Sequence, residues 1–175
     1  MYHGYHHDLS RLIESEVLGQ WAFATAARSD RSPTRRAQWR TLERLEVQTH
    51  ERAEAFLRRV GRPVPAARAA RVAGGVFGVL PWRPQLRLLF DTTRVYLPVF
   101  ERLERAHRGG PDHGLFAYIV EHERALATFA QRERAGQGGS LDDVERLLDG
   151  APPTDDAGTE RPKAAPTSSG RAPPS

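Results

Sequence analysis

The stretch that decides the fold runs from Leu42 to Val60 and reads Leu-Glu-Arg-Leu-Glu-Val-Gln-Thr-His-Glu-Arg-Ala-Glu-Ala-Phe-Leu-Arg-Arg-Val. Apolar side chains recur every three or four residues, which predicts one amphipathic helix with a stripe of Leu42, Leu45, Ala53, Phe56, Leu57 and Val60. Glu46 interrupts this stripe, and His50, four residues later, can share its face. A buried carboxylate is costly unless it is paired, hydrogen-bonded or bound to a metal. We therefore expect other helices to bring partners to Glu46.

Composition limits the class of protein. The chain has 175 residues, of which 39% are hydrophobic and 27% are charged, which is typical of one globular domain with a core and a tail. The absence of cysteine excludes disulfides, thiolate metal ligands and a cysteine nucleophile. The net charge of +4 comes with charges of alternating sign along helices and without a nucleic-acid-binding motif, so solvated helix faces are favoured over nucleic-acid binding. No apolar segment resembles a secretion signal or a membrane span, so we expect a cytoplasmic protein.

The first two helices are expected to pack as an antiparallel pair. A helix capped by Asp8 or Ser10 should extend to about Arg28, with Glu16 inside its apolar stripe. Glu16 either points into the core or lies at the edge of the stripe and pairs with an arginine. Ser32 is the expected cap of the second helix, with Pro33 as its first residue, and the connection between the helices is short.

Two further helices are predicted after residue 64. Residues 65–79 are rich in alanine, valine and glycine, which favours a helix that a neighbour can approach closely. We assign the apolar segment 72–82 to the core, with an exposed binding or membrane-touching patch as the alternative. The long helix 85–107 carries Glu104 and His107 at a spacing of three residues, which is either a metal-ligand pair or an exposed helix end.

The last long helix should begin at residue 111 or 112 and extend to about 134, with His122 and Glu123 inside its apolar face. Either side chain can point inward, His122 as a ligand or as a satisfied core histidine. A short helix should follow Ser140, over 141–148. Residues 150–175 are rich in Ala, Pro, Thr and Ser and should be disordered. No strand is predicted. The expected architecture is all-α: a four-helix-type bundle in domain 1–149, with an extra short C-terminal helix and a disordered tail.

Four long helices with glutamates inside their apolar faces, and histidines near them, resemble the ferritin-like superfamily over about residues 8–135. The resemblance implies a bundle that holds two metal ions with a glutamate from each helix and a Glu-x-x-His pair on two helices. Glu16, Glu46 and Glu123 match the glutamates of the first, second and fourth helices. Thr49 stands where a histidine would follow Glu46, and the Glu104–His107 pair lies on the third long segment.

The candidate metal ligands share one property, which is a carboxylate or imidazole group on or near an apolar helix face: Glu16, Glu46, His50, His122, Glu123, Glu104 and His107. Such groups suit iron or manganese, and the resemblance implies an oxygen-dependent oxidoreductase. The alternative is a non-catalytic helical bundle without metal that binds itself or a partner. A basic nucleic-acid-associated module is a third hypothesis. We expect self-association, and no substrate is indicated. The first hypothesis predicts that the candidate ligands converge, and the second predicts that they pair with arginines on separate surfaces.

Overall fold

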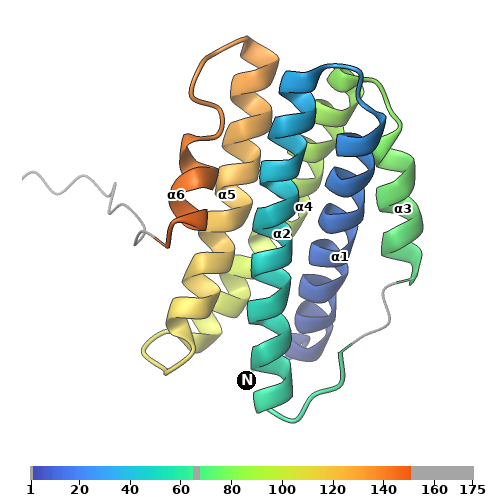
Figure 1. Cartoon of the computed structure of the whole chain (residues 1–175). Helices are drawn as coiled ribbons and strands as arrows, with labels where there is room; N and C mark the ends of the chain where they lie inside the picture. The colour runs from blue at the N-terminus through green and yellow to red at the C-terminus, as the bar shows by residue number, and fades with distance from the viewer. Residues whose placement is uncertain (1, 65–67, 151–175) are drawn as a thin grey trace, which may run out of the picture.

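The computed structural model describes residues 2–64 and 68–150, and these residues form helices and connecting loops without a strand (Figure 1). The helices are α1 (Tyr5–Ser29), α2 (Pro33–Arg59), α3 (Arg68–Gly78), α4 (Trp82–His107), α5 (His113–Ala135) and α6 (Asp142–Leu148). The predicted all-α class is confirmed. The predicted disordered tail falls almost entirely on 151–175, which lies outside the described residues.

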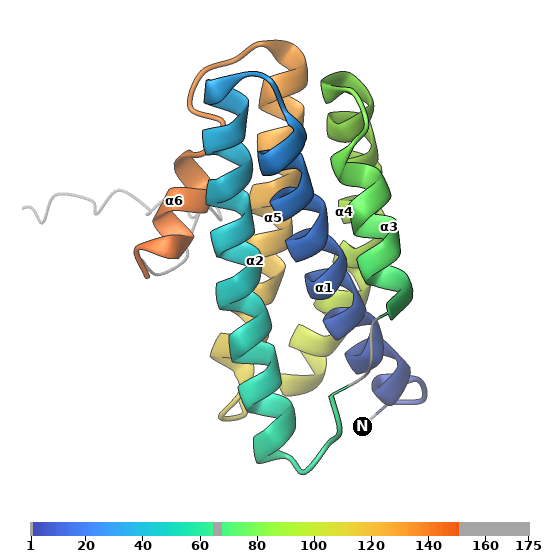
Figure 2. The ribbon, with the colours of Figure 1, turned by 45° about the vertical axis from the view of Figure 1, so that its right-hand side comes forward.

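Four long helices form the bundle. Helix α1 packs against α2 and α4, and α5 packs against α4 and α2, so each of the four has two neighbours. Figure 1 shows α1 and α2 joined at one end as the antiparallel pair that their short connection predicts. Helix α3 lies against α1 on the outside of the bundle, and α6 packs on α2 and α5 (Figure 2). The two short helices therefore cover different sides of the same four-helix core.

The start of α2 agrees with the sequence, whereas the start of α1 does not. The Ser32 side chain accepts a hydrogen bond from the backbone N–H of Arg35, and Pro33 is the first helical residue. Helix α1 begins at Tyr5, before both predicted caps. A contact between α1 and α4 explains why Asp8 does not cap the helix. The side chain of Asp8 is buried and accepts hydrogen bonds from Arg102 of α4, so it is not free to cap a helix.

Helix α4 also begins earlier than predicted, at Trp82 instead of Gln85. Pro84 lies in its first turn, where a missing backbone N–H removes no intrahelical hydrogen bond. Pro81, the N-cap residue, and Pro84 therefore stand at the beginning of α4.

Helix α3 lies very close to α1 because two of its residues are glycines. A Cβ atom on Gly74 would lie 2.6 Å from the backbone oxygen of Leu18, and one on Gly78 would lie 2.4 Å from Cβ of Thr25. The predicted close approach is confirmed. The assignment of segment 72–82 to the core was wrong for its valines: Phe77 and the glycines occupy the buried face, which leaves Val72, Val76 and Val79 exposed. In the described part of the chain, no helix has the length and apolar character needed to cross a membrane.

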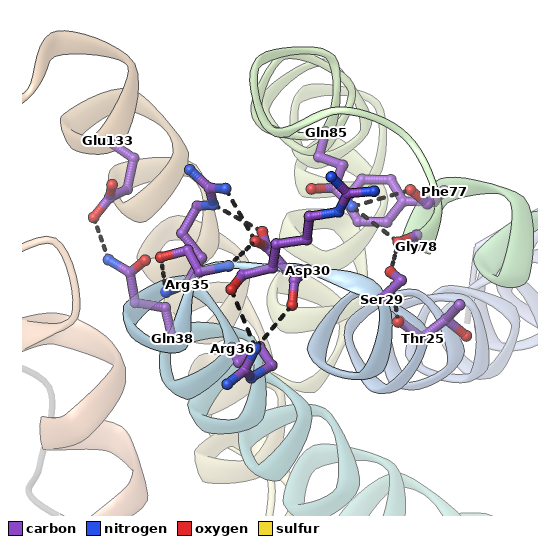
Figure 3. A network of polar contacts seen from close by, with 12 residues as sticks. Thr25, Ser29, Asp30, Arg35, Arg36, Gln38, Phe77, Gly78, Gln85 and Glu133 are labelled. Atoms are coloured by element: carbon purple, nitrogen blue, oxygen red, sulfur yellow. Dashed lines mark hydrogen bonds and ion pairs between the residues drawn. The ribbon is translucent and has the colours of Figure 1, made fainter.

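Polar contacts fix the end of α3 to its neighbours (Figure 3). The Ser29 hydroxyl donates to the backbone oxygen of Gly78 at 2.6 Å, which joins α3 to the end of α1. The buried side-chain amide of Gln85 donates to the backbone oxygens of Phe77 and Gly78 at 3.3 and 3.2 Å, which joins α3 to α4. These bonds hold α3 in place although its contact with α4 is otherwise small.

The apolar core is divided into two clusters along the length of the bundle. One contains Phe23, Trp39, Leu45 and Phe129 among others, and the second contains Ile13, Phe56, Phe100 and Phe116 among others. Buried polar groups stand where the two clusters meet. Glu46 on α2 and His122 with Glu123 on α5 lie between the clusters, and Glu16 on α1 lies next to Val17, the last residue of the second cluster on that helix. The candidate site therefore lies at mid-height of the bundle, with apolar packing above and below it.

Candidate metal centre

Three side chains from three helices converge at this position. Glu16, Glu46 and His122 each offer one ligand atom, and these atoms lie within 4.8 Å of one another. The exposed fraction of each residue is 3% or less, because each stands in the apolar stripe that its helix turns toward the core. The sequence predicted all three as metal ligands, and the structure brings them together.

The imidazole ring of His122 lies between the two carboxyl groups. Its Nδ1 atom is 3.7 Å from Oε2 of Glu16, and its Nε2 atom is 3.5 Å from Oε1 of Glu46. Both distances are longer than hydrogen bonds. Both ring nitrogens and Oε2 of Glu16 are buried without a hydrogen-bond partner among the described residues. Buried polar atoms of native proteins normally have partners, so this geometry points to a bound species among the three side chains.

A glycine on α1 makes room for the carboxyl group of Glu46. A Cβ atom on Gly19 would lie 2.4 Å from both Cδ and Oε1 of Glu46, which is far inside van der Waals contact. Glycine in the middle of a helix is unfavourable by about 1 kcal/mol relative to alanine, so its presence at this point has a structural reason. The space beside Gly19 holds the Glu46 carboxyl group against α1.

Burial strongly perturbs the acids of the site. It raises the pKa of Glu46 to about 8. Burial raises the pKa of Glu16 well above its usual value, and the nearby Glu46 raises it further, although His122 opposes this. Within the described residues, Glu16 and Glu46 form ion pairs only with His122 and none with an arginine. A divalent cation would offset the cost of burying these carboxylates and would let them ionise.

Glu123 lies beside this group but is not one of its three members. It follows His122 on α5, its exposed fraction is 5%, and its carboxyl group makes no hydrogen bond or ion pair with any described residue. Burial raises the pKa of Glu123 well above the usual value, and the charges of Glu46 and Glu16 add to this effect against that of His122. Glu123 is therefore a second unpaired carboxyl group at the same height of the bundle.

A pocket of about 240 Å³ leads from the surface to these acids. Its outer part includes the exposed residues Ala73 of α3 and Leu88 of α4, and its inner part includes Glu16, Glu46 and Glu123. The walls between are mostly apolar, with Leu18, Ala22, Phe23, Phe77, Leu89 and Leu126. Ala73 and Phe77 of α3, the helix that packs against α1 (Figure 2), belong to the lining of this pocket.

Besides Glu123, the other three predicted ligands, His50, Glu104 and His107, also lie outside the convergent group. Nε2 of His50 lies 3.1 Å from Oε1 of Glu54, one turn further along α2. Glu104 accepts hydrogen bonds from Arg108, and its Oε1 lies 2.7 Å from Nε2 of His113. The contacts of Glu104 join the end of α4 to Arg108 and to His113 at the start of α5.

His107, the predicted partner of Glu104, is held in an aromatic environment. Its Nε2 atom lies 2.7 Å from the hydroxyl of Tyr5, and its ring stacks on Phe116 with 4.1 Å between the ring centres. Burial lowers the pKa of His107. The Glu-x-x-His spacing on α4 therefore serves packing and surface ion pairs.

Helix α4 contributes hydroxyl groups to the site region instead of a carboxylate. Thr92, Thr93 and Tyr96 line the pocket, and Thr93 is buried with its hydroxyl donating to the backbone oxygen of Phe90 at 2.8 Å. Sequence reasoning missed these residues and Gly19. A glycine inside a strongly helical pattern was the one available signal for Gly19, whereas the threonines carry no such signal.

Comparison with known proteins gave no relatives: no model of a known protein family, no curated protein and no solved structure matched the chain.

Proposed function

We propose that the protein is a ferritin-like bundle that binds one iron or manganese ion through Glu16, Glu46 and His122. The observation that carries the proposal is the position of the His122 ring, whose two buried nitrogens lack partners and face two buried carboxyl groups. One potential ligand atom from each of the three side chains lies within 4.8 Å of the other two, which is close enough for a single ion to contact all three.

The donor set supports iron or manganese. Carboxylate oxygens and an imidazole nitrogen are the ligands that these ions accept, and three protein ligands leave coordination positions open. Bound iron would supply oxygen chemistry, so we propose an oxygen-dependent oxidoreductase as the activity. The chain itself holds the two glutamates and the histidine in place, excludes bulk water by the apolar clusters on both sides, and leaves one apolar path to the surface.

Elemental analysis tests the proposal. The full-length chain is expressed in medium supplemented with iron and manganese, purified, and its metal content measured per chain. We expect about one ion per wild-type chain and a loss of at least tenfold in the Glu46→Gln and His122→Leu variants. Glu104→Gln is the matched control, because this glutamate was predicted from the same pattern but pairs with Arg108 and His113. Metal-free wild-type protein, or equal loss of metal in the control, would overturn the proposal.

A second candidate function, self-association, is favoured by one observation. Val72 and Val76 of α3, and Val79 directly after its end, are all exposed, and their spacing places them along one side of this helix. Exposed apolar patches on small domains are commonly interfaces. We propose that a second copy of the chain covers this face of α3. Analytical ultracentrifugation of wild type and Val76→Asp tests this: a dimer that the substitution dissociates supports it, and a wild-type monomer at high concentration contradicts it.

A further inference from the structure

The pocket beside the metal centre has a chemical character of its own. Its lining contains three carboxyl groups, from Glu16, Glu46 and Glu123, and no arginine, lysine or histidine. The remaining polar side chains are neutral hydroxyls, those of Ser15, Thr92, Thr93 and Tyr96. An anion would meet only negative or neutral groups in this pocket, whereas a cation would meet complementary charge at the inner end.

Glu123 is the acid that the proposed metal centre leaves unused. It is 5% exposed, lines the pocket, and has no hydrogen-bond or ion-pair partner among the described residues. Its carboxyl oxygens are not among the enclosed atoms that lack partners, which fits a carboxyl group open to the pocket. A largely buried carboxylate is stabilised by an opposite charge, so a positively charged group of a ligand in the pocket would suit Glu123.

We propose that this pocket binds a small primary amine, with its ammonium group on the carboxylate of Glu123 and its apolar body between α1, α3 and α4. The mostly apolar walls suit a ligand with an aromatic or hydrocarbon body, and Phe23 and Phe77 are the two phenylalanines of the lining. A cavity of about 150 Å³ holds benzene. The pocket volume of about 240 Å³ therefore admits one ring with a short aminoalkyl chain.

The proposal goes beyond metal binding and does not depend on it, because Glu123 lies outside the three-residue group. The test is calorimetric titration of the full-length protein, in metal-free and in metal-loaded form, with three probes of similar shape. These are 2-phenylethylamine, the neutral 2-phenylethanol and the anion phenylacetate. We expect the amine to bind at least about tenfold more tightly than the alcohol in both forms, and phenylacetate to give no saturable binding.

Three variants locate the binding. Glu123→Gln should reduce the affinity for 2-phenylethylamine at least about tenfold, to that of the alcohol. Ala73→Phe at the exposed rim should weaken the binding of the amine and of the alcohol to the same extent, because the larger side chain narrows the pocket and leaves its carboxyl groups unchanged. Glu121→Gln is the control, since this glutamate pairs with Arg124 on the surface of the same helix. It should bind as wild type does.

Equal affinity for amine and alcohol, an unchanged affinity in Glu123→Gln, or no saturable binding of the amine would each overturn the proposal. Because the probes are titrated into metal-free protein as well, failure of amine binding is distinct from failure of metal binding. Amine binding in a chain that takes up no metal would support this inference while contradicting the metal centre.

Discussion

The ring of His122 faces two glutamates from two different helices, with Nε2 directed to Glu46 of α2 and Nδ1 directed to Glu16 of α1. One side chain of α5 thus connects three helices at mid-height of the bundle. A histidine in this position can contribute one ring nitrogen to an ion that the two carboxylates also bind. Without an ion, the same arrangement buries polar atoms that have no partners, which is destabilising.

The Gly19→Ala substitution should weaken metal binding. The added Cβ would lie 2.4 Å from Cδ and Oε1 of Glu46, so the carboxyl group has to move away from the other two ligands. Alanine gains about 1 kcal/mol in helix propensity, but overpacking of this kind destabilises by about 1 to 3 kcal/mol. We expect a net loss of stability and at least tenfold weaker binding of manganese, measured by urea unfolding and by metal titration.

Gly75→Ala is the matched control, because Gly75 is helical and its Cβ would meet nothing within 4 Å. This variant should be as stable as wild type or more stable by up to about 1 kcal/mol, with unchanged metal affinity. If Gly19→Ala behaved in the same way, the carboxyl group of Glu46 would not need the space beside α1.

The metal-free protein should become less stable as the pH rises above about 5. Burial raises the pKa of Glu46 to about 8 in the folded chain, whereas an unfolded glutamate has a pKa of about 4.3. The folded state therefore binds more protons than the unfolded state. The protonated Glu46 side chain contributes fully to stability below the pKa of an unfolded glutamate, and this contribution is lost as the pH rises through the pKa of Glu46 in the folded chain. Urea unfolding in the presence of a chelator, between pH 5 and 9, measures it.

The Glu46→Gln variant should show a smaller decline over the same pH range, since an amide has no proton to lose. Residual dependence is expected from Glu16 and Glu123, whose pKa values burial also raises. Identical pH profiles for the variant and wild type would contradict the account of Glu46 as a buried acid. Added manganese should flatten the wild-type profile, because the ion stabilises the ionised carboxylates.

The acidic end of the pH scale tests a different pair. Burial alone would raise the pKa of Asp8, but the hydrogen bonds from Arg102 and Tyr2 outweigh it, and the pKa is lowered. The stabilisation by the ionised Asp8 carboxylate is present above the pKa of an unfolded aspartate and is lost as the pH falls through the pKa of Asp8 in the folded chain. The free energy of unfolding of the Asp8→Asn variant should be about 1 kcal/mol lower than that of wild type at pH 7. The value is modest because Arg102 is partly exposed.

The difference in stability between the Asp8→Asn variant and wild type should shrink as the pH falls below about 4, the pKa of an unfolded aspartate, and denaturant unfolding at pH 7 and at pH 3 measures this change. If the difference in the free energy of unfolding were the same at both pH values, the contact between Asp8 and Arg102 would stabilise the fold by packing and not by charge.

The closeness of α3 to α1 gives a further prediction. Gly74→Val should destabilise the fold by about 1 to 3 kcal/mol, because a Cβ there would lie 2.6 Å from the backbone oxygen of Leu18, which cannot move freely. The displacement of α3 should also widen the pocket and raise proteolysis within α3. Thermal unfolding and limited proteolysis of the Gly74→Val variant, with the Gly75→Ala variant as the control, check this. Equal behaviour of the two variants would contradict the close packing.

Periodicity predicted a buried position for Glu46 and left Glu16 open between the core and the edge of its stripe. Glu16 and Glu46 interrupt apolar stripes, and both are buried. The same reasoning failed for His50, because a shift of four residues turns the side chain slightly past the stripe. Thr49, three residues after Glu46, is the buried neighbour, and it donates to the backbone oxygen of Leu45. His50 instead lies beside Glu54.

Long-range contacts explain what the sequence could not predict. Glu104 and His107 have ligand spacing, yet His107 contacts Tyr5, which is 102 residues earlier in the chain. The pocket depends on the position of α3, and only the small side chains of Gly74 and Gly78 indicated that a neighbour would approach this helix. Which neighbour it would be, and that Ser29 and Gln85 would hold its end, required the folded structure.

The most direct test of the metal centre is diffraction from crystals of the full-length protein grown with manganese, recorded at the manganese absorption edge. The account predicts one anomalous peak at ligand distance from the Glu16 and Glu46 carboxylates and from a ring nitrogen of His122, absent in the His122→Leu variant. A peak confined to the surface histidines, or no peak among these three side chains, would contradict it.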